Sequence, residues 1–321
     1  MPSRPTIVID TLGSDRGPET VIEGAKLVLA ENPDLNLTLV GNEEQIRNSG
    51  IDLSRVKIIH APHALTNYDN PVAAFYDKSA DYSVFKALEE VGKDENAIGM
   101  ISSGSTGALF VGVVRYLLDE ERHRPALAAI LPATTGGVTC LVDTGASIDC
   151  GPRQLVEFAH LGSDFMKKLY KIESPRVGLL SNGSEPGKGN KVVKETHQLL
   201  AADKSINFIG NIEGNHALTG DCDVLVADGF AGNQVLKNTE GTALVLIGEM
   251  MKWGKMTGHE MEAKMIAGHL MKTYDFQSLG AGVMLGVRKY VLKCRGSSNA
   301  DSIKNVAKIL VNVHNNKTFY E

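Results

Sequence analysis

The sequence has few cysteines, few aromatic residues and no long apolar run. Of its 321 residues, 4 are Cys and 1 is Trp. The cysteines at positions 140, 150, 222 and 294 stand far apart, without a Cys-x-x-Cys pair or a His at zinc-ligand spacing. This pattern is typical of neither a zinc knuckle nor a disulfide framework. We therefore expect reduced, mostly buried thiols and no metal.

No uninterrupted apolar stretch reaches the length of about 18 residues that a membrane-spanning helix requires. The first residues, Met1–Pro5, lead into a strand-like run that is too brief for the apolar region of a signal peptide. The formal charge of −5 offers no surplus of Lys and Arg for a phosphate backbone, so we expect no nucleic-acid partner. These patterns predict a cytoplasmic protein.

Short β-rich apolar runs alternate with longer amphipathic segments, which indicates βαβ units and a largely parallel sheet. The predicted strands cover residues 6–9, 36–40, 56–60, 97–101, 126–131, 139–144, 177–180, 207–210, 224–227 and 290–293. The predicted helices cover about 18–31, 43–48, 79–91, 106–119, 155–169, 190–202 and 233–251. No linker rich in Pro, Gly or Ser divides this series, so we expect a single α/β domain over residues 1–321.

The segment 250–273 is rich in Met, Lys and Gly and contains Trp253. It predicts one or two helices with a break at a glycine. Three interpretations stay open for this candidate tip: plain core, a dimer arm, or a surface that touches a membrane.

The most informative turn follows the predicted strand 97–101 and leads directly into a helix. It contains the candidate phosphate-binding residues Ser103, Gly104, Ser105, Thr106 and Gly107. Small residues let backbone N–H groups close around an anion, hydroxyl groups add donors, and the helix N-terminus supplies partial positive charge. The alternative is an ordinary N-capped helix start with turn glycines.

Four more turns follow predicted strands, where ligands of open α/β sheets bind. Asp10 begins the turn after the first predicted strand, where it is placed to orient or activate a nucleophile, and nearby Asp15 is equally explained as a helix cap. Lys188 lies between two glycines in the turn 181–190, where its ammonium group can hold an anion, although an exposed loop lysine is the alternative. The third turn runs from Asp228 to Asn233, and the fourth is 295–299. We expect Asp228 to orient its neighbours and Asn233 to donate to a carbonyl oxygen.

The sequence lacks the common signatures of other chemistries. It has no Gly-x-Ser-x-Gly elbow, no His-Glu-x-x-His, no P-loop and no Gly-x-Gly-x-x-Gly after the first strand. Hydrolase, metalloprotease, nucleotide triphosphate and dinucleotide sites are therefore not indicated, and no cofactor is expected.

In order along the chain, the turns resemble the signature of the acyl-carrier-protein:phosphate acyltransferase (PlsX) family. The motifs that carry the resemblance are Asp-x-x-Gly-x-Asp at 10–15, Ser-Gly-x-Thr-Gly-Ala-Leu at 103–109, Arg-Pro-Ala-Leu at 124–127, Lys-Gly-Asn at 188–190, Asp-Gly-Phe-x-Gly-Asn at 228–233 and Gly-Ser-Ser-Asn at 296–299. The match runs from about residue 6 to about residue 312.

This resemblance implies a homodimeric three-layer α/β/α fold, akin to phosphotransacetylases and to isocitrate or isopropylmalate dehydrogenases, with a protruding helical pair. It implies transfer of a fatty acyl group from acyl carrier protein (ACP) to inorganic phosphate for phospholipid synthesis, and peripheral membrane contact through the tip at 250–273. We expect Lys188 and Asn233 near the reacting centre, with Asp10 and Asp228 as orienting carboxylates. The predicted substrate-binding residues are Gly189, Asn190, Gly229, Gly232, Ser297, Ser298 and Asn299.

The chain departs from the family pattern in the segment 73–78. Where the family carries several Arg and Lys, this chain has Ala73, Phe75, Tyr76, Asp77 and Lys78. Loss of positive charge there favours two alternatives: a coenzyme A-dependent phosphate acyltransferase, or a catalytically weak relative that binds ACP or a membrane.

Overall fold

The computed structural model describes residues 4–77, 79–119, 121, 123–273 and 281–315. The chain forms two compact units. Unit 1 lies within Met1–Leu127, Lys168–Lys171 and Gly280–Glu321, and unit 2 comprises Ala128–Lys167 and Ile172–Leu279. Whether the two units act as the single domain expected from the sequence stays a prediction.

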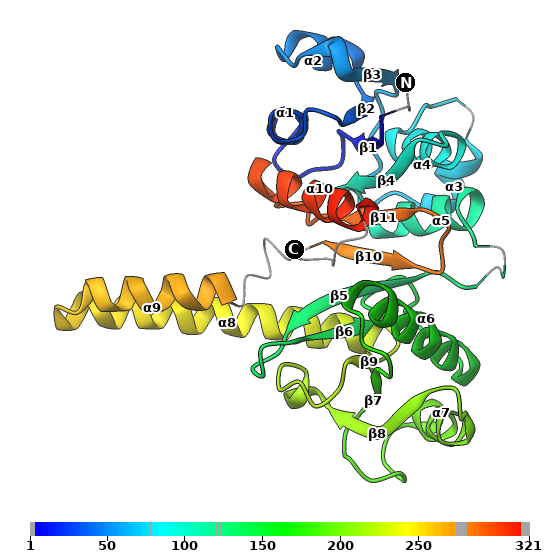
Figure 1. The fold of residues 1–321 in the computed structure, drawn as a ribbon, viewed down its shortest axis with the longest axis vertical. Helices are drawn as coiled ribbons and strands as arrows, with labels where there is room; N and C mark the ends of the chain where they lie inside the picture. The colour runs from blue at the N-terminus through cyan, green and yellow to red at the C-terminus, as the bar shows by residue number, and fades with distance from the viewer. Residues whose placement is uncertain (1–3, 78, 120, 122, 274–280, 316–321) are drawn as a thin grey trace. The chain divides into compact units, whose positions relative to one another are not determined.

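Unit 1 is a largely parallel sheet with helices on both faces. Its strands follow the order β3-β2-β1-β4-β11-β10, in which β10 runs antiparallel to β11 and the pairs from β3 to β11 are parallel. Figure 1 shows α1 and α10 on one side of this sheet and α3, α4 and α5 on the other. The strands are β1 (Thr6–Asp10), β2 (Asn36–Gly41), β3 (Val56–His60), β4 (Ala97–Ser102), β10 (Gly282–Leu285) and β11 (Tyr290–Lys293). The helices are α1 (Pro18–Glu31), α2 (Glu43–Asn48), α3 (Pro71–Tyr76), α4 (Ser83–Lys93), α5 (Thr106–Tyr116) and α10 (Ala300–His314), with a 3-10 turn at Leu53–Arg55.

Unit 2 carries five strands in a mixed parallel and antiparallel arrangement. Its strand order is β5-β6-β9-β7-β8, with β5 and β6 antiparallel and the remaining pairs parallel. The strands are β5 (Ala126–Pro132), which begins at the end of unit 1, β6 (Val138–Val142), β7 (Arg176–Ser181), β8 (Asn207–Glu213) and β9 (Val224–Val226). The helices are α6 (Pro152–Tyr170), α7 (Lys191–Ala202), α8 (Gly229–Thr257) and α9 (Glu260–Thr273), with a 3-10 turn at Gly214–His216.

The sequence pattern accounts for most of these elements. All five residues of β1 and all seven of β5 are buried, as expected for strands covered on both faces. Helix α1 begins at Pro18, where the missing N–H costs nothing, and buries one stripe that includes Val21, Ala25 and Val28. The mostly parallel α/β architecture predicted from the alternation is therefore confirmed.

Several predicted boundaries are wrong. The helix expected over 79–91 is α4, from Ser83 to Lys93, and the short helix α3 precedes it because Asn70 caps Pro71–Tyr76 through the amides of Val72 and Ala73. Helix α5 ends at Tyr116, before the predicted residue 119. The strand expected over 139–144 ends at Val142, because Asp143 accepts hydrogen bonds from the following loop.

The segment 250–273 lies in two packed helices. Helix α8 ends at Thr257, Gly258 adopts the left-handed conformation with φ 77°, and α9 follows. Figure 1 shows both helices extending away from the sheet of unit 2. None of the helices in the described part of the chain is both long and apolar enough to span a membrane.

Candidate functional site

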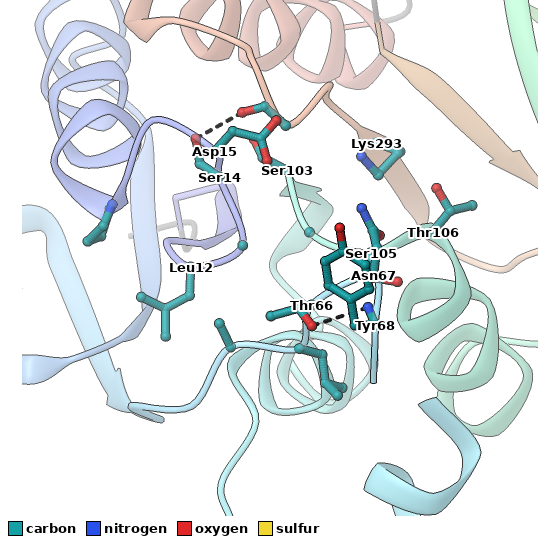
Figure 2. Close-up of a pocket in the computed structure, with 16 residues that line it drawn as sticks. Leu12, Ser14, Asp15, Thr66, Asn67, Tyr68, Ser103, Ser105, Thr106 and Lys293 are labelled. Carbon is teal, nitrogen blue, oxygen red and sulfur yellow. Dashed lines mark hydrogen bonds between the residues drawn. The ribbon is translucent and has the colours of Figure 1, made fainter. Parts of the chain in front are cut away.

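A cavity of about 510 Å³ opens in unit 1 where three neighbouring strands end. The register pairs Ser102 of β4 with Asp10 of β1 on one side and with Lys293 of β11 on the other. The turns that follow these strands therefore begin at the same level of the sheet. Figure 2 shows the cavity, which is lined by residues 12–15, 18, 64–68, 103–106, 293 and 296.

The first and second of these turns touch through their backbones. Gly13 has φ 83°, a conformation that favours glycine, and a Cβ atom there would lie 2.6 Å from the Cα of Gly104. The third turn is held to the first because the amide of Asp15 donates to the carbonyl of Gly296 at 2.9 Å, and the Ser14 hydroxyl donates to the same carbonyl. The three turns thus form one packed wall.

Asp10 lies behind these turns and holds them through hydrogen bonds. Its carboxylate is 1% exposed, and it accepts hydrogen bonds from the Ser102 hydroxyl at 2.8 Å and from the Leu12 amide at 3.2 Å. The Ser102 oxygen in turn accepts from the Gly104 amide at 3.0 Å. Burial raises the pKa of Asp10 to about 6, and hydrogen bonds from Ser83 and Ser102 oppose that rise. Asp10 is not among the described residues that line the cavity, so it acts on the turn through Ser102.

The second turn presents donors to the cavity. Ser103 is 3% exposed, and its hydroxyl oxygen has no hydrogen-bond partner among the described residues. Ser105 is the N-cap of α5 and makes no side-chain capping bond, so the first amides of this 11-residue helix keep their unsatisfied donors. A buried hydroxyl without an acceptor beside an uncapped helix N-terminus is the chemistry of an anion site.

Lys293 is a site residue that sequence reasoning missed. Its side chain is half-buried, lines the cavity, and donates from Nζ to the Cys294 carbonyl. Lys293 lies outside the turn motifs described from the sequence, and its place at the site follows from the register between β11 and β4. The loop 64–68 was missed as well, although it follows β3 as the other turns follow their strands.

The other unit 1 candidates have mainly structural contacts. Gly107 lies beyond the cavity lining, and a Cβ there would lie 3.4 Å from Cγ of Pro71 in α3. Asn299 caps α10 by accepting from the amide and the hydroxyl of Ser302, each at 2.9 Å. Ser297 accepts from Nε of Arg16 through its carbonyl, and the Ser298 amide donates to the carbonyl of Arg295. The turn 295–299 reaches the cavity through Gly296.

The departing segment 73–78 is built into the fold beside α5. Ala74 is buried, and the ring of Phe75 contacts the rings of Phe85 and Tyr116 in edge-on arrangements. Asp77 accepts from the amide and hydroxyl of Ser79, which lowers the pKa of its carboxyl group. Lys78 lies outside the described residues.

In unit 2, the remaining candidates follow β9 and β7 of the sheet. Asp228 caps α8 by accepting from the amide of Ala231 at 2.7 Å, and the side-chain amide of Asn233 donates to the Thr144 carbonyl at 2.8 Å. A Cβ on Gly229 would lie 2.7 Å from an Asp143 carboxylate oxygen, and one on Gly232 would overlap the Asp143 carbonyl. The first turn of α8 therefore packs directly on the loop that follows β6.

That loop is organised by Asp143, which sequence reasoning assigned no role in the site. Its carboxylate is fully buried and accepts from the amides of Gly145, Ala146 and Ser147 at 3.3, 3.1 and 2.6 Å. These bonds fix the Thr144 carbonyl that holds Asn233.

Lys188 is exposed in the loop after β7, and Asn190 caps α7 by accepting from the Val193 amide at 2.9 Å. The Gly189 amide donates to Asn182 at 2.8 Å, and the side chain of Asn211 in β8 donates to the Glu185 carbonyl. The loop is thereby tied down on both sides, with the Lys188 side chain exposed.

Three of the four cysteines are poor nucleophiles. All four are buried, as the sequence predicted, and none is in a disulfide. Burial raises the pKa of the Cys140, Cys222 and Cys294 thiols to about 12, so they stay protonated at neutral pH. Among the described residues, no group of three His, Cys, Asp or Glu side chains is placed to hold a metal.

Comparison with known proteins gives one consistent family. Residues 5–317 match the family described as "Fatty acid synthesis protein". A protein named "Phosphate acyltransferase" from Bacillus cereus is 39% identical over 303 residues, which cover 92% of this chain and 91% of that protein. One of the same name from Thermoanaerobacter pseudethanolicus is 38% identical over 309 residues, covering 94% and 91%.

Solved structures share the fold at low sequence identity. A phosphotransacetylase from Streptococcus pyogenes has a TM-score of 0.62 at 18% identity and covers 97% of this chain and 94% of its own. A branched-chain phosphotransacylase from Enterococcus faecalis V583 has a TM-score of 0.58 at 16% identity, covering 95% and 96%. The family matches confirm the resemblance drawn from the turn motifs. The chain belongs to the fatty acid synthesis protein family.

Proposed function

We propose that this protein is a phosphate acyltransferase that transfers a fatty acyl group from ACP to inorganic phosphate. Its products are an acyl phosphate, which serves phospholipid synthesis, and the free thiol of ACP. The observation that carries the proposal is the buried, unpartnered hydroxyl of Ser103 at the uncapped N-terminus of α5, in a chain whose relatives are named phosphate acyltransferases. This is the donor set that a phosphate acceptor substrate requires.

The reaction needs positioning and charge stabilisation more than a strong base. A phosphate oxygen attacks the thioester carbonyl, a tetrahedral oxyanion forms, and the thiolate leaves as the carbonyl re-forms. Phosphate is partly dianionic at neutral pH, because its second pKa is near ~7, so a dedicated general base is unnecessary. The high pKa of the buried thiols agrees with direct attack and no acyl-cysteine intermediate.

We assign roles on this basis. Ser103, Gly104, Ser105 and Thr106 hold the phosphate, and Gly107 follows them in the first turn of α5 as part of the same proposed site. Lys188 and Asn233 act on the reacting carbonyl: the exposed ammonium of Lys188 and the second N–H of the Asn233 amide are the donors for the oxyanion.

Asp10 and Asp228 are positioning residues, because their carboxylates accept hydrogen bonds from the turns that carry the proposed donors. The predicted contacts of Gly189, Asn190, Gly229, Gly232 and residues 297–299 with substrate are part of the same proposal.

The finer structural expectations belong here too. We propose the isocitrate or isopropylmalate dehydrogenase type of α/β/α fold, a homodimer, and a protruding tip at 250–273 that touches the membrane surface. The tip proposal is supported by the exposed apolar side chains of Trp253, Met256, Met261, Met265 and Ile266 on α8 and α9. Co-sedimentation with anionic vesicles, compared between the wild type and Trp253→Ser/Met256→Ser, tests it. Equal sedimentation of the two proteins would contradict it.

The donor experiment tests the proposed function itself. Purified protein is given inorganic phosphate and, separately, long-chain acyl-ACP, long-chain acyl-CoA or acetyl-CoA, and acyl phosphate is trapped with hydroxylamine. We expect product with acyl-ACP. Product only from a CoA thioester would assign the chain to the coenzyme A-dependent alternative, and no product from any donor would overturn the proposed activity.

A further inference from the structure

The unit 1 cavity contains a cation that neither the turn motifs nor the family match assigns to the site. Lys293 ends β11, and its register partner in β4 is Ser102, the residue directly before Ser103. Its side chain lines the same cavity as Ser103, Ser105 and Thr106, as Figure 2 shows. The pairing of β11 with β4 therefore places the ammonium group of Lys293 in the same cavity as the unpartnered hydroxyl of Ser103.

The charges around the cavity make this lysine important. Among the described residues that line it, Lys293 is the one Lys or Arg, and Asp15 is the one carboxylate. The Asp15 carboxylate packs directly on Gly296, where a Cβ atom on residue 296 would overlap it. Asp10 lies just behind the wall, and the positive charge of Lys293 lowers the pKa of its carboxyl group against the larger effect of burial. Without Lys293, a phosphate dianion would meet only helix-end amides and hydroxyls beside acidic groups.

We propose that Lys293 is the phosphate-binding cation of this cavity and that Ser103 Oγ is its buried partner donor. A phosphate group has several oxygens that each accept hydrogen bonds. The Lys293 ammonium, the buried Ser103 hydroxyl and the first amides of α5 are the donors that these oxygens need. This assignment rests on the proposed function for the identity of the ligand as inorganic phosphate. The same chemistry also fits the phosphate ester of a phosphopantetheine arm, so the experiment must separate the two sources.

Direct titration separates a binding role from a structural one. Inorganic phosphate is titrated into the full-length protein by isothermal calorimetry, and 4′-phosphopantetheine is titrated in a parallel series. The variants are Lys293→Met, Lys293→Arg and Ser103→Ala. Lys289→Met is the matched control, because Lys289 donates to the Ala97 carbonyl at 2.7 Å near the other end of the strand and does not line the cavity.

We expect the phosphate Kd to rise about 10-fold or more in Lys293→Met and about fivefold in Ser103→Ala, since a charge-assisted bond is stronger than a neutral one. Lys293→Arg keeps the charge and should recover part of the affinity. The control should stay within about twofold of wild type. In turnover, the KM for phosphate should rise in Lys293→Met while the KM for the acyl donor stays unchanged.

The outcomes are distinguishable. An unchanged phosphate Kd in a folded Lys293→Met protein would overturn the assignment even if the enzyme turns over. Loss of phosphopantetheine binding with intact phosphate binding would move the site to the donor and overturn it as well. Phosphate binding that depends on Lys293 in a protein without turnover would support the site and refute the proposed activity. If Lys293→Met does not fold, Ser103→Ala and Lys293→Arg decide the question.

Discussion

The carboxylate of Asp10 accepts a 2.8 Å hydrogen bond from the hydroxyl of Ser102, a residue 92 positions later in the chain. The two residues are register partners at the ends of neighbouring parallel strands, and both are almost completely buried. Because the Ser102 oxygen also accepts from the Gly104 amide, Asp10 controls the shape of the turn that presents Ser103. A carboxylate in this position adjusts the anion site without touching the ligand.

This relationship predicts a pH-dependent stability. The pKa of Asp10 is raised from 3.8 to about 6, so the folded protein binds the proton more tightly than the unfolded chain does. The stability contributed by protonated Asp10 is therefore complete below about pH 4 and is lost as the pH rises to about 6. At about 1.4 kcal/mol per pKa unit, the loss is roughly 3 kcal/mol.

Urea unfolding of wild type and Asp10→Asn between pH 4 and 7 measures this loss. The difference in unfolding free energy between the two proteins should shift against the wild type over that range and level off above pH 6. A difference that is independent of pH would refute the assignment of the raised pKa.

The contact between the first and second turns predicts a large effect of Gly13→Ala. The added Cβ would lie 2.6 Å from the Gly104 Cα, and the backbone at φ 83° disfavours a side chain. We expect a loss of roughly 2–4 kcal/mol of unfolding free energy, since strain and overlap add. We also expect a raised KM for phosphate, because the overlap pushes the anion turn out of place.

Gly50→Ala is the matched control, because Gly50 has φ 77° but no atom within 4 Å of an added Cβ. It should cost about 1 kcal/mol, the effect of the left-handed backbone alone. Equal destabilisation by the two substitutions would show that the contact between the turns is loose.

The packing of α8 on the loop after β6 predicts a similar contrast in unit 2. A Cβ on Gly232 would overlap the carbonyl of Asp143, so Gly232→Ala should lower the free energy of unfolding by about 3 kcal/mol or more. Gly241→Ala, in the same helix with no atom within 4 Å, should raise it by about 0.5–1 kcal/mol. Thermal unfolding followed by circular dichroism measures both. A stable Gly232→Ala protein would contradict the described approach of helix and loop.

The proposed donors in unit 2 predict a loss of turnover. Lys188→Ala and Asn233→Ala should each lower kcat by about 100-fold or more, since lost contacts to an oxyanion usually cost that much. Lys194→Ala, an exposed lysine on α7, should leave kcat within about twofold. Steady-state acyl-phosphate formation by proteins of verified fold checks this, and rates within about threefold of wild type for both variants would remove them from the mechanism.

Much of the fold follows from the sequence, because a buried parallel strand needs a continuous apolar run and each run here is followed by a polar turn. The start of α3 was missed although Asn70-Pro71 is a recognisable helix start, because the apolar pattern there is short. Asn190, Asp228 and Asn299 show a different limit. Each was predicted as a ligand contact or an orienting group, and each caps a helix in the structure, because the same residue types suit both roles.

Other parts of the site depend on pairing between distant segments. Lys293 gains its place from the register of β11 with β4, and Asp143 gains its importance from three amides in the loop that follows it. No local pattern encodes a strand order in which β1, β4 and β11 are neighbours. The identity of the turns was therefore predictable, whereas their partners were not.

The most direct test of the central claim is the release of the ACP thiol from long-chain acyl-ACP, measured with and without inorganic phosphate. Our account predicts that thiol release requires phosphate, saturates with it, and equals acyl-phosphate formation one for one. Thiol release without phosphate would identify a thioesterase, and the absence of release with phosphate present would contradict the proposed acyl transfer.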